Sequence, residues 1–319
     1  MQATGTEKRE QISRHAVTAV KRKRFPKRQL YFMLLPNLVL FTALTVYPIF
    51  WALRYMFYDY DGIHAATFTG ADNFIRLFTR DTVYWDSLVN TLIYAAGKLL
   101  IVIPLSFLVA VVINLRFRGS TLLQAVIFSP TIMSSAVMAL MFYLLFNVYN
   151  GDVNHYLSLA GLIEQPVDWL GQHFAMITVI IVAVWGGLGN YMVYFLAGLQ
   201  TIPRDIYESA ELDGVTYWQR LFYITLPMLG PVLRVILMLA ILNSFQDIQS
   251  IMVLTEGGPL GKTQVVFLYM YQLFFPVSTS SPIKPEIGYG AAASVVTGLI
   301  LGLITLIYLY LSKKLEKIY

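Results

Sequence analysis

Six long, nearly uncharged apolar stretches constrain this chain more than any other feature. They occupy residues 31–53, 88–115, 122–146, 174–199, 228–253 and 289–311. About 20 apolar residues in a helix match the hydrocarbon core of a bilayer, and in lipid the backbone has to satisfy its own hydrogen bonds. With 57% hydrophobic and 13% charged residues, the chain carries too much apolar surface for a water-soluble domain. We therefore predict an all-α polytopic membrane protein with six transmembrane helices. Kinks are expected near Pro36, Pro48, Pro104, Pro130 and Pro231.

Lysine and arginine are distributed unevenly between the two ends of these predicted helices. With the N-terminus inside, sixteen of them lie on the inner side and five on the outer side. Because positive residues accumulate on the cytoplasmic side, both termini are predicted to be cytoplasmic. The chain then divides into a basic tail (1–29) that contacts membrane lipid, one membrane domain (30–312) with an inner loop at 201–223, and a short cytoplasmic tail (313–319).

Several function classes are disfavoured by composition. The chain has no cysteine, and its four histidines are far apart in sequence, so neither a thiolate nucleophile nor a metal site is expected. The net charge of +5 is concentrated in the N-terminal tail and does not form a face that could bind nucleic acid. The run from Gly257 to Thr263 resembles a phosphate-binding loop but is one residue short and follows a membrane helix. ATP hydrolysis is therefore expected to belong to another polypeptide.

The inner loop between the fourth and fifth stretches is predicted to contain a short helix. Thr201 can cap this helix, Pro203 suits its first turn, and Gly214 suits a left-handed residue at its end. Four acidic residues make the loop acidic on a side that is otherwise basic: Asp205, Glu208, Glu211 and Asp213. The acidic composition favours a surface that docks a partner, and the alternative is an ordinary surface helix that joins two spans.

One spacing in this loop is diagnostic. Glu208-Ser209-Ala210, three residues, Gly214, nine residues and then Ile224-x-Leu226-Pro227 resemble the EAA signature of ABC importer permeases, with Ser209 in place of the second alanine. In that family the loop is the coupling helix that docks into a cytosolic ATPase. The resemblance assigns this coupling role to Glu208, Ser209, Ala210, Asp213, Gly214 and Pro227.

Two further runs resemble the carbohydrate-uptake branch of the same family, of the maltose and multiple-sugar type. The first runs from Asn243-x-Phe245 through Leu254 to Pro259, with Thr263 beyond, and the second from Gly288 to Ser294. The resemblance implies a type I importer permease fold in the bacterial inner membrane and sugar transport by alternating access. It also implies a second, homologous permease subunit, two ATPase subunits that bind ATP and Mg²⁺, and an extracytoplasmic solute-binding protein. This chain itself is expected to bind no cofactor and to be no enzyme.

Polar side chains inside the predicted spans are candidates for the solute pathway, because such groups are costly in lipid. Amides, a carboxylate and aromatic rings suit the hydroxyl edges and C–H faces of sugars. The candidates come from the fourth and fifth spans: Asn190, Tyr191, Tyr194, Asn243, Ser244, Gln246 and Asp247. The alternative is that they hold helices together. Lys98 and Arg234 could favour an acidic saccharide, or could snorkel or pair internally.

Small residues recur every fourth position along the sixth span, at Gly290, Ser294, Gly298 and Gly302, and predict a ridge for packing against another helix. The glycines of span four, Gly186, Gly187 and Gly189, admit the same reading. Three rival functions remain: an ABC permease for an amino acid or inorganic anion, a stand-alone secondary transporter, and a membrane-embedded enzyme. The last would need catalytic constellations that the spans do not offer.

Overall fold

The computed structural model describes residues 27–275 and 285–316, and these residues are mostly helical. Most of the predicted basic tail and the last three residues of the C-terminal tail lie outside the described residues. The chain divides into two compact units, residues 1–52 and 53–319. In the first unit, α2 (Lys27–Phe41) contains Pro36 and continues through a π-helical turn, η1 (Thr42–Val46), into α3 (Tyr47–Leu53). The segment Tyr31–Phe57 is long and apolar enough to cross a membrane.

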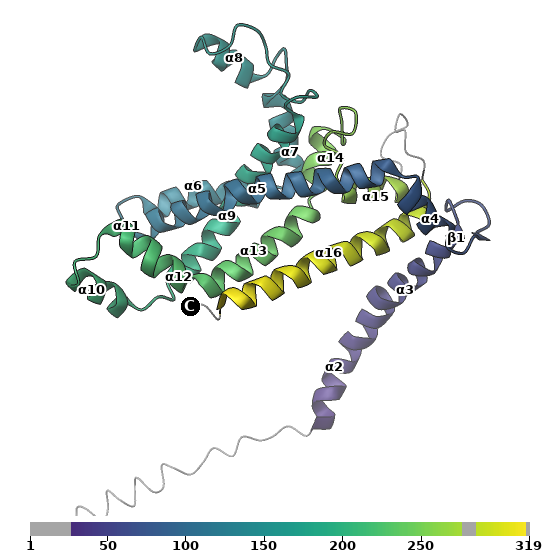
Figure 1. Ribbon diagram of the computed structural model, residues 1–319, viewed down its shortest axis with the longest axis horizontal. Helices are drawn as coiled ribbons and strands as arrows, with labels where there is room; N and C mark the ends of the chain where they lie inside the picture. Colours follow the sequence, from purple (N-terminus) through teal and green to yellow (C-terminus); the bar gives the residue numbers. More distant parts are fainter. Residues whose placement is uncertain (1–26, 276–284, 317–319) are drawn as a thin grey trace, which may run out of the picture. The chain divides into compact units, whose positions relative to one another are not determined.

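The second unit begins with the turn η2 (Arg54–Phe57), an antiparallel pair of short strands, β1 (Tyr58–Asp59) and β2 (Thr67–Phe68), and α4 (Asp72–Thr79). Helices follow in the order shown in Figure 1. They are α5 (Thr82–Asn114), α6 (Ser120–Ile132), α7 (Ser135–Leu145), α8 (Asp152–Leu159), α9 (Ala175–Leu199), α10 (Arg204–Leu212), α11 (Tyr217–Gln219), the π-helical turn η3 (Arg220–Thr225), α12 (Leu226–Met228), α13 (Gly230–Phe245), α14 (Gln249–Leu254), α15 (Val266–Phe274) and α16 (Ile287–Glu316).

The prediction of an all-α membrane protein is confirmed, and four of the six predicted spans are continuous apolar helical segments: Tyr31–Phe57, α5, α9 and α16. The third and fifth spans differ from the prediction. Residues 120–145 form α6 and α7, which meet at an angle of 98°, and residues 217–245 form two segments bent by 70° at Gly230. The fifth span also ends at Phe245, earlier than predicted, and α14 follows as a separate short helix.

Two helices form the framework of the second unit. α5 and α9 lie against each other, and Ser106 of α5 donates a hydrogen bond to the Leu188 carbonyl of α9, 3.2 Å away. Buried apolar side chains of α5, α9 and α13 make one continuous core, which includes Val102, Met192 and Ile236. Since these side chains are fully buried between helices, their packing holds the three helices in register.

A second core joins α4, α5, α15 and α16 around one carboxylate. Asp81 caps α5 by accepting a hydrogen bond from the Tyr84 backbone N–H at 2.9 Å. The hydroxyls of Tyr269 and Tyr289 also donate to Asp81, and the former lies 2.6 Å from Oδ2. We call Asp81, Tyr84, Tyr269 and Tyr289 the Asp81 cluster. It fastens α15 and α16 to the first turn of α5.

An ion pair borders the Asp81 cluster. The Arg76 guanidinium pairs with Glu286, with 3.3 Å between Nη2 and Oε1, and lies 4.1 Å from the centre of the Tyr289 ring. The Glu286 carboxylate raises the pKa of Arg76, and burial raises the pKa of Tyr269. Arg76 and Tyr269 therefore keep their protons at any physiological pH.

Candidate functional site

A cavity of about 400 Å³ opens among the helices of the second unit. It is bordered by the middle of α5, by the junction of α6 and α7, by α9 and by the segment between α13 and α14. The lining is rich in amides, hydroxyls and aromatic rings, and it includes Thr131, Ser135, Asn190, Tyr191, Tyr194, Asn243, Gln246, Gln249 and Ser250. Such a surface can donate and accept hydrogen bonds in many directions.

The structure brings six of the seven predicted pathway residues to this cavity: Asn190, Tyr191, Tyr194, Asn243, Gln246 and Asp247. They come from two segments, 190–194 and 243–247, that lie more than forty positions apart in the sequence. Ser244 is the exception, because its side chain is buried and its hydroxyl donates to the Ala240 carbonyl, 2.7 Å away in the same helix. Ser244 therefore does not line this cavity, and its part in a solute pathway stays a prediction.

Both irregular segments next to the cavity are interruptions of predicted spans. Met133 has an extended backbone where α6 ends, and Met133 and Ser135 line the cavity. Residues 246–248 separate α13 from α14 and line it as well. Non-helical backbone is tolerated at membrane depth where it faces a cavity, since its polar groups then escape the lipid. The cavity explains why these two spans do not continue as regular helices.

The cavity contains one buried ion pair. Lys98 Nζ of α5 donates to Asp247 Oδ2 at 3.1 Å, and the two side chains are only 8% and 15% exposed. The Tyr94 hydroxyl, one turn before Lys98, also donates to Asp247, and Ser250 donates to Oδ1 at 3.1 Å. Of the readings left open for Lys98, internal pairing is thus the one observed.

Sequence reasoning missed part of this lining. Tyr94 and Ser250 bond Asp247, and Thr131, Ser135 and Gln249 complete the polar surface. One signal was available, because Tyr94 and Lys98 are four residues apart and share a helix face. The contribution of the α6–α7 junction had no comparable signal, since it depends on a backbone break that hydropathy does not reveal.

The glycines of the fourth span serve two purposes. A side chain at Gly189 would lie 2.8 Å from the Ile127 carbonyl oxygen and 2.9 Å from the Phe128 Cα, so this glycine lets α9 approach the backbone of α6. Gly186 likewise faces the Met138 side chain. Gly187, in contrast, has more room, and both Gly186 and Gly187 line the cavity.

The glycine ridge on α16 has neighbours at one end only. A Cβ on Gly290 would meet Leu273 and Phe274 of α15, whereas a Cβ on Gly298 or Gly302 would meet no atom of the described residues within 4 Å. The expected packing is therefore observed for Gly290 and not for Gly298 or Gly302 within this chain.

The acidic inner loop forms a short helix, as expected. α10 spans Arg204–Leu212, carries Asp205 in its first turn and is followed by Gly214 with a left-handed φ of +72°. Its N-terminus differs from the prediction. Thr201 donates its hydroxyl to the Gly198 carbonyl at 2.7 Å and so completes the end of α9, while Pro203 takes the extended N-cap position.

Part of the EAA-like loop borders one shallow hollow. Ser209, Ala210, Asp213 and Ile224 line it, and its volume is about 350 Å³. Ala210 is buried, which explains why a small residue is needed there, whereas Glu208 is exposed. Pro227 lies at the start of α12. Glu208, Ser209 and Asp213 are thus available to a partner, and their role stays a prediction.

One side chain connects α10 to the beginning of the fifth span. The Tyr207 hydroxyl lies 3.2 Å from Thr225 Oγ1, and Arg220 lies 5.7 Å from the centre of the Tyr207 ring. We call Tyr207, Arg220 and Thr225 the Tyr207 link. The three residues of the link border a small pocket together with Asn114 and Leu115, at the C-terminal end of α5. Sequence analysis did not identify this connection.

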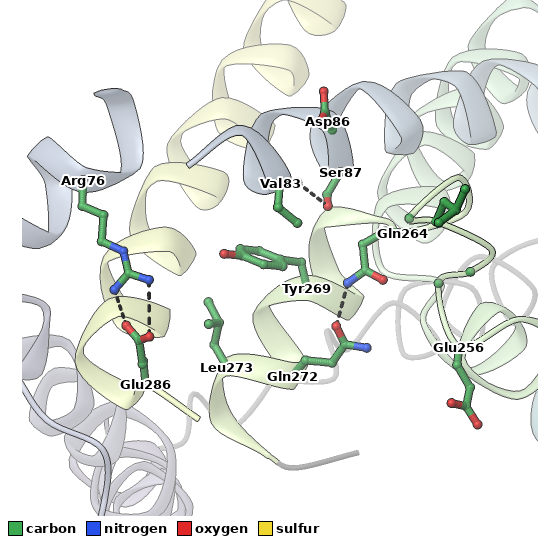
Figure 2. A pocket seen from close by; sticks show the side chains of 14 residues that line it. Arg76, Val83, Asp86, Ser87, Glu256, Gln264, Tyr269, Gln272, Leu273 and Glu286 are labelled. Atoms are coloured by element: carbon green, nitrogen blue, oxygen red, sulfur yellow. Dashed lines mark hydrogen bonds and ion pairs between the residues drawn. The ribbon is translucent and has the colours of Figure 1, made fainter. Parts of the chain in front are cut away.

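A larger cavity of about 730 Å³ lies at the other end of α5, beside the loop that precedes α15 (Figure 2). Gln264 donates to Gln272 across its wall at 2.7 Å, and Arg76, Asp86, Glu256 and Glu286 border it. The loop is folded by Thr263, which donates to the Gly258 carbonyl at 2.7 Å and contacts Thr255. The run from Gly257 to Thr263, which resembles a phosphate-binding loop, is thus a turn in which the Thr263 hydroxyl bonds the backbone of the same loop.

The chain resembles known transport proteins over most of its length. Residues 102–317 match the family model described as "Binding-protein-dependent transport system inner membrane component". The chain is 31% identical over 283 residues to the lactose transport system permease protein LacF of Rhizobium radiobacter, covering 88% of this chain and 92% of the relative. It is 30% identical over 284 residues to the trehalose/maltose transport system permease protein MalF of Thermococcus litoralis, covering 88% and 92%.

The fold also resembles a solved structure. A chain in the crystal structure of a bacterial ABC transporter involved in the import of the acidic polysaccharide alginate matches with a TM-score of 0.75 and 26% identity, covering 90% of this chain and 95% of that chain. The same transporter type in complex with an alginate pentasaccharide-bound periplasmic protein gives a TM-score of 0.77 and 25% identity, covering 91% and 95%. The chain described here belongs to the family of binding-protein-dependent transport system inner membrane components, the permease subunits of ABC importers.

Proposed function

We propose that this chain is the permease subunit of an ATP-driven importer that moves a sugar or oligosaccharide into the cytoplasm by alternating access. The observation that carries the proposal is the cavity among the membrane helices. Amides, hydroxyls and tyrosine rings line it, and the α6–α7 junction and the 246–248 segment border it. Transported sugars need hydrogen-bonding partners that can also release them, and neutral polar groups meet that requirement. The relatives named for lactose and for trehalose/maltose support a saccharide as the solute.

The proposed subunit works with several partners. Two cytosolic ATPase subunits that hold ATP and Mg²⁺ dock on α10, and a second, homologous permease completes the pathway. A binding protein delivers the sugar at the opposite end, where α4 and α15 lie, and the periplasmic protein in the alginate transporter structure supports this partner. The charge distribution of the sequence favours an α10 end that faces the cytoplasm, with both termini on that side.

The proposal is tested by reconstituting the complete transporter in liposomes and measuring uptake of labelled saccharides together with ATP hydrolysis. Glu208→Lys reverses a charge on the exposed face of α10 and is expected to lower uptake at least about tenfold, because a charge-assisted contact to the ATPase is replaced by a like-charge one. The variant is expected to remain inserted in the membrane, which membrane fractionation checks.

Glu164→Lys is the matched control, since Glu164 is also exposed and lies between α8 and α9, away from α10. Its uptake equals that of the unmodified transporter. Unchanged uptake in Glu208→Lys would remove the coupling assignment. Uptake by this chain without any ATPase would contradict the importer assignment, and stimulation of the ATPase by an amino acid or inorganic anion alone would contradict the sugar assignment.

A further inference from the structure

The charges that line the cavity bear on which saccharides it accepts. Among the described residues of the lining, two carry a charge, Lys98 and Asp247. They form an ion pair with 3.1 Å between Nζ and Oδ2. The cavity wall of this subunit therefore has no net charge, although it contains a lysine.

The ion pair is completed by further hydrogen bonds. Asp247 Oδ2 accepts from the Tyr94 hydroxyl in addition to Lys98, and Oδ1 accepts from Ser250 at 3.1 Å. Both carboxylate oxygens are thus occupied. Tyr94 is itself buried between the helices. Asp247 holds the ammonium of Lys98 in place, and Tyr94 and Ser250 hold Asp247.

A solute with carboxylate groups would disturb this arrangement. To bind such a solute, Lys98 would have to turn away from Asp247 and leave a buried carboxylate without its cation, which is strongly unfavourable at low dielectric. If Lys98 stayed paired, the solute carboxylate would meet the negative charge of Asp247 without a free cation nearby. A neutral saccharide avoids both costs, since Asn190, Asn243 and Gln246 can bond its hydroxyls.

We propose that this subunit selects uncharged saccharides, and that Asp247 enforces the selection by neutralising Lys98. The inference rests on the proposed sugar transport and adds the charge class of the sugar. It runs against the expectation from fold resemblance alone, because the similar solved structures belong to an importer of an acidic polysaccharide.

The test uses pairs of trisaccharides that share one skeleton and differ at C6, where one member has CH₂OH and the other a carboxylate. Gluco, galacto and manno pairs are bound at equilibrium to the complete transporter in nanodiscs. For the pair that matches the solute, the neutral member is expected to bind at least about tenfold more tightly, a difference of about 1.4 kcal/mol.

Asp247→Asn keeps the size of the side chain and frees the charge of Lys98. In this variant the preference for the neutral member is expected to fall at least about tenfold. The double variant Lys98→Met, Asp247→Asn removes both charges and is expected to bind neutral saccharides without any gain for uronates. Where the single variant fails to assemble, the paired trisaccharides in the unmodified transporter still test the selection. Asp152→Asn, at an exposed acid outside the cavity, is the control and keeps the original preference.

Three outcomes would overturn the inference. A tighter uronate in the unmodified transporter would show that the cavity does not select neutral sugars. An unchanged preference in Asp247→Asn would remove the role of Asp247. Binding of no saccharide, together with ATPase stimulation by a non-saccharide solute, would overturn the sugar assignment and the inference together, and this result differs from the first two.

Discussion

The continuous helices α5 and α9 and the broken spans around them have similar hydropathy but different structures. α5 runs for 33 residues and α9 for 25, and they contact each other closely, as at Gly97 and Ile180. The spans at 120–145 and 217–245 bend by 98° and 70°. The straight helices hold buried apolar side chains between them, whereas the α6–α7 junction and the 246–248 segment face the polar cavity.

This difference indicates that apolar segments of similar composition have different roles. The continuous helices supply a close-packed frame, which resists deformation. The interruptions place backbone and amides beside a cavity, and a bend is also a point at which a helix can change direction during a conformational change. Changes to the frame should therefore reduce the amount of folded protein, and changes near the bends should alter transport more than stability.

The largest effect is expected where the frame meets a broken span. Gly189→Val places a side chain against the α6 backbone, where even a Cβ would be 2.8 Å from the Ile127 carbonyl oxygen. Backbone cannot yield as a flexible side chain does, and overpacking costs about 1–3 kcal/mol or more. We expect at least about a tenfold loss of assembled transporter, measured by size-exclusion chromatography of a fluorescent fusion.

Gly230→Ala is the control at a bend. A Cβ at Gly230 would meet nothing within 4 Å, and alanine favours the helix, so the yield is expected to stay the same or rise. If Gly189→Val assembled normally, α6 and α9 would not be in the close contact described. The expected difference between a close-packed helix and a bend would then be contradicted at this position.

A smaller effect is expected at the Asp81 cluster. Asp81→Asn keeps an N-cap for α5 but removes the charge that accepts hydrogen bonds from Tyr269 and Tyr289. The difference between charged and neutral hydrogen bonds corresponds to about 1–2 kcal/mol of stability. The thermal midpoint of the purified complex should fall by several degrees, while Asp72→Asn, an exposed acid in the first turn of α4, should leave it unchanged. An equal shift in both variants would speak against a specific role for Asp81.

The smallest effect on stability, with a specific effect on function, is expected at the Tyr207 link. Thr225→Val removes the hydroxyl that lies 3.2 Å from the Tyr207 hydroxyl and joins α10 to the bent fifth span. A hydrogen bond contributes about 0.5–1.5 kcal/mol, so the sugar transported per ATP hydrolysed should fall about two- to tenfold.

Thr305→Val makes the same chemical change on α16, where the hydroxyl donates to the Leu301 carbonyl of its own helix at 2.8 Å. Its transport ratio should match the unmodified transporter. If Thr305→Val lowered the sugar transported per ATP as much as Thr225→Val, the contact between α10 and the fifth span would have no specific role in coupling.

Much of the fold follows from local properties of the sequence. Hydropathy locates all six apolar segments, because membrane thickness sets their length independently of tertiary structure. The acidic helix α10 and its left-handed Gly214 also follow from local rules. The breaks at 133–134 and 246–248 do not, since their backbone is favoured only when a cavity formed by other helices is present.

The candidate site shows the same limit. Asn190, Tyr191 and Asn243 could be selected because polar groups are rare in lipid, but chemistry alone did not separate Gln246 from Ser244, which points elsewhere. Distinguishing them requires the orientation of the helix end. The partner of Lys98 is likewise a property of the tertiary structure, because Lys98 and Asp247 are 149 residues apart and meet only when α5 packs beside the segment that follows α13.

The order in which the ribosome produces these two charges has a consequence for biogenesis. Lys98 emerges 149 residues before Asp247, so α5 enters the translocon with an ammonium group whose counterion has not been synthesised. A lone lysine at the centre of a nascent helix costs about 2.5–3.5 kcal/mol on insertion scales. The apolar residues of α5 have to offset this cost alone during insertion, and pairing with Asp247 removes it only once the later helix has been made.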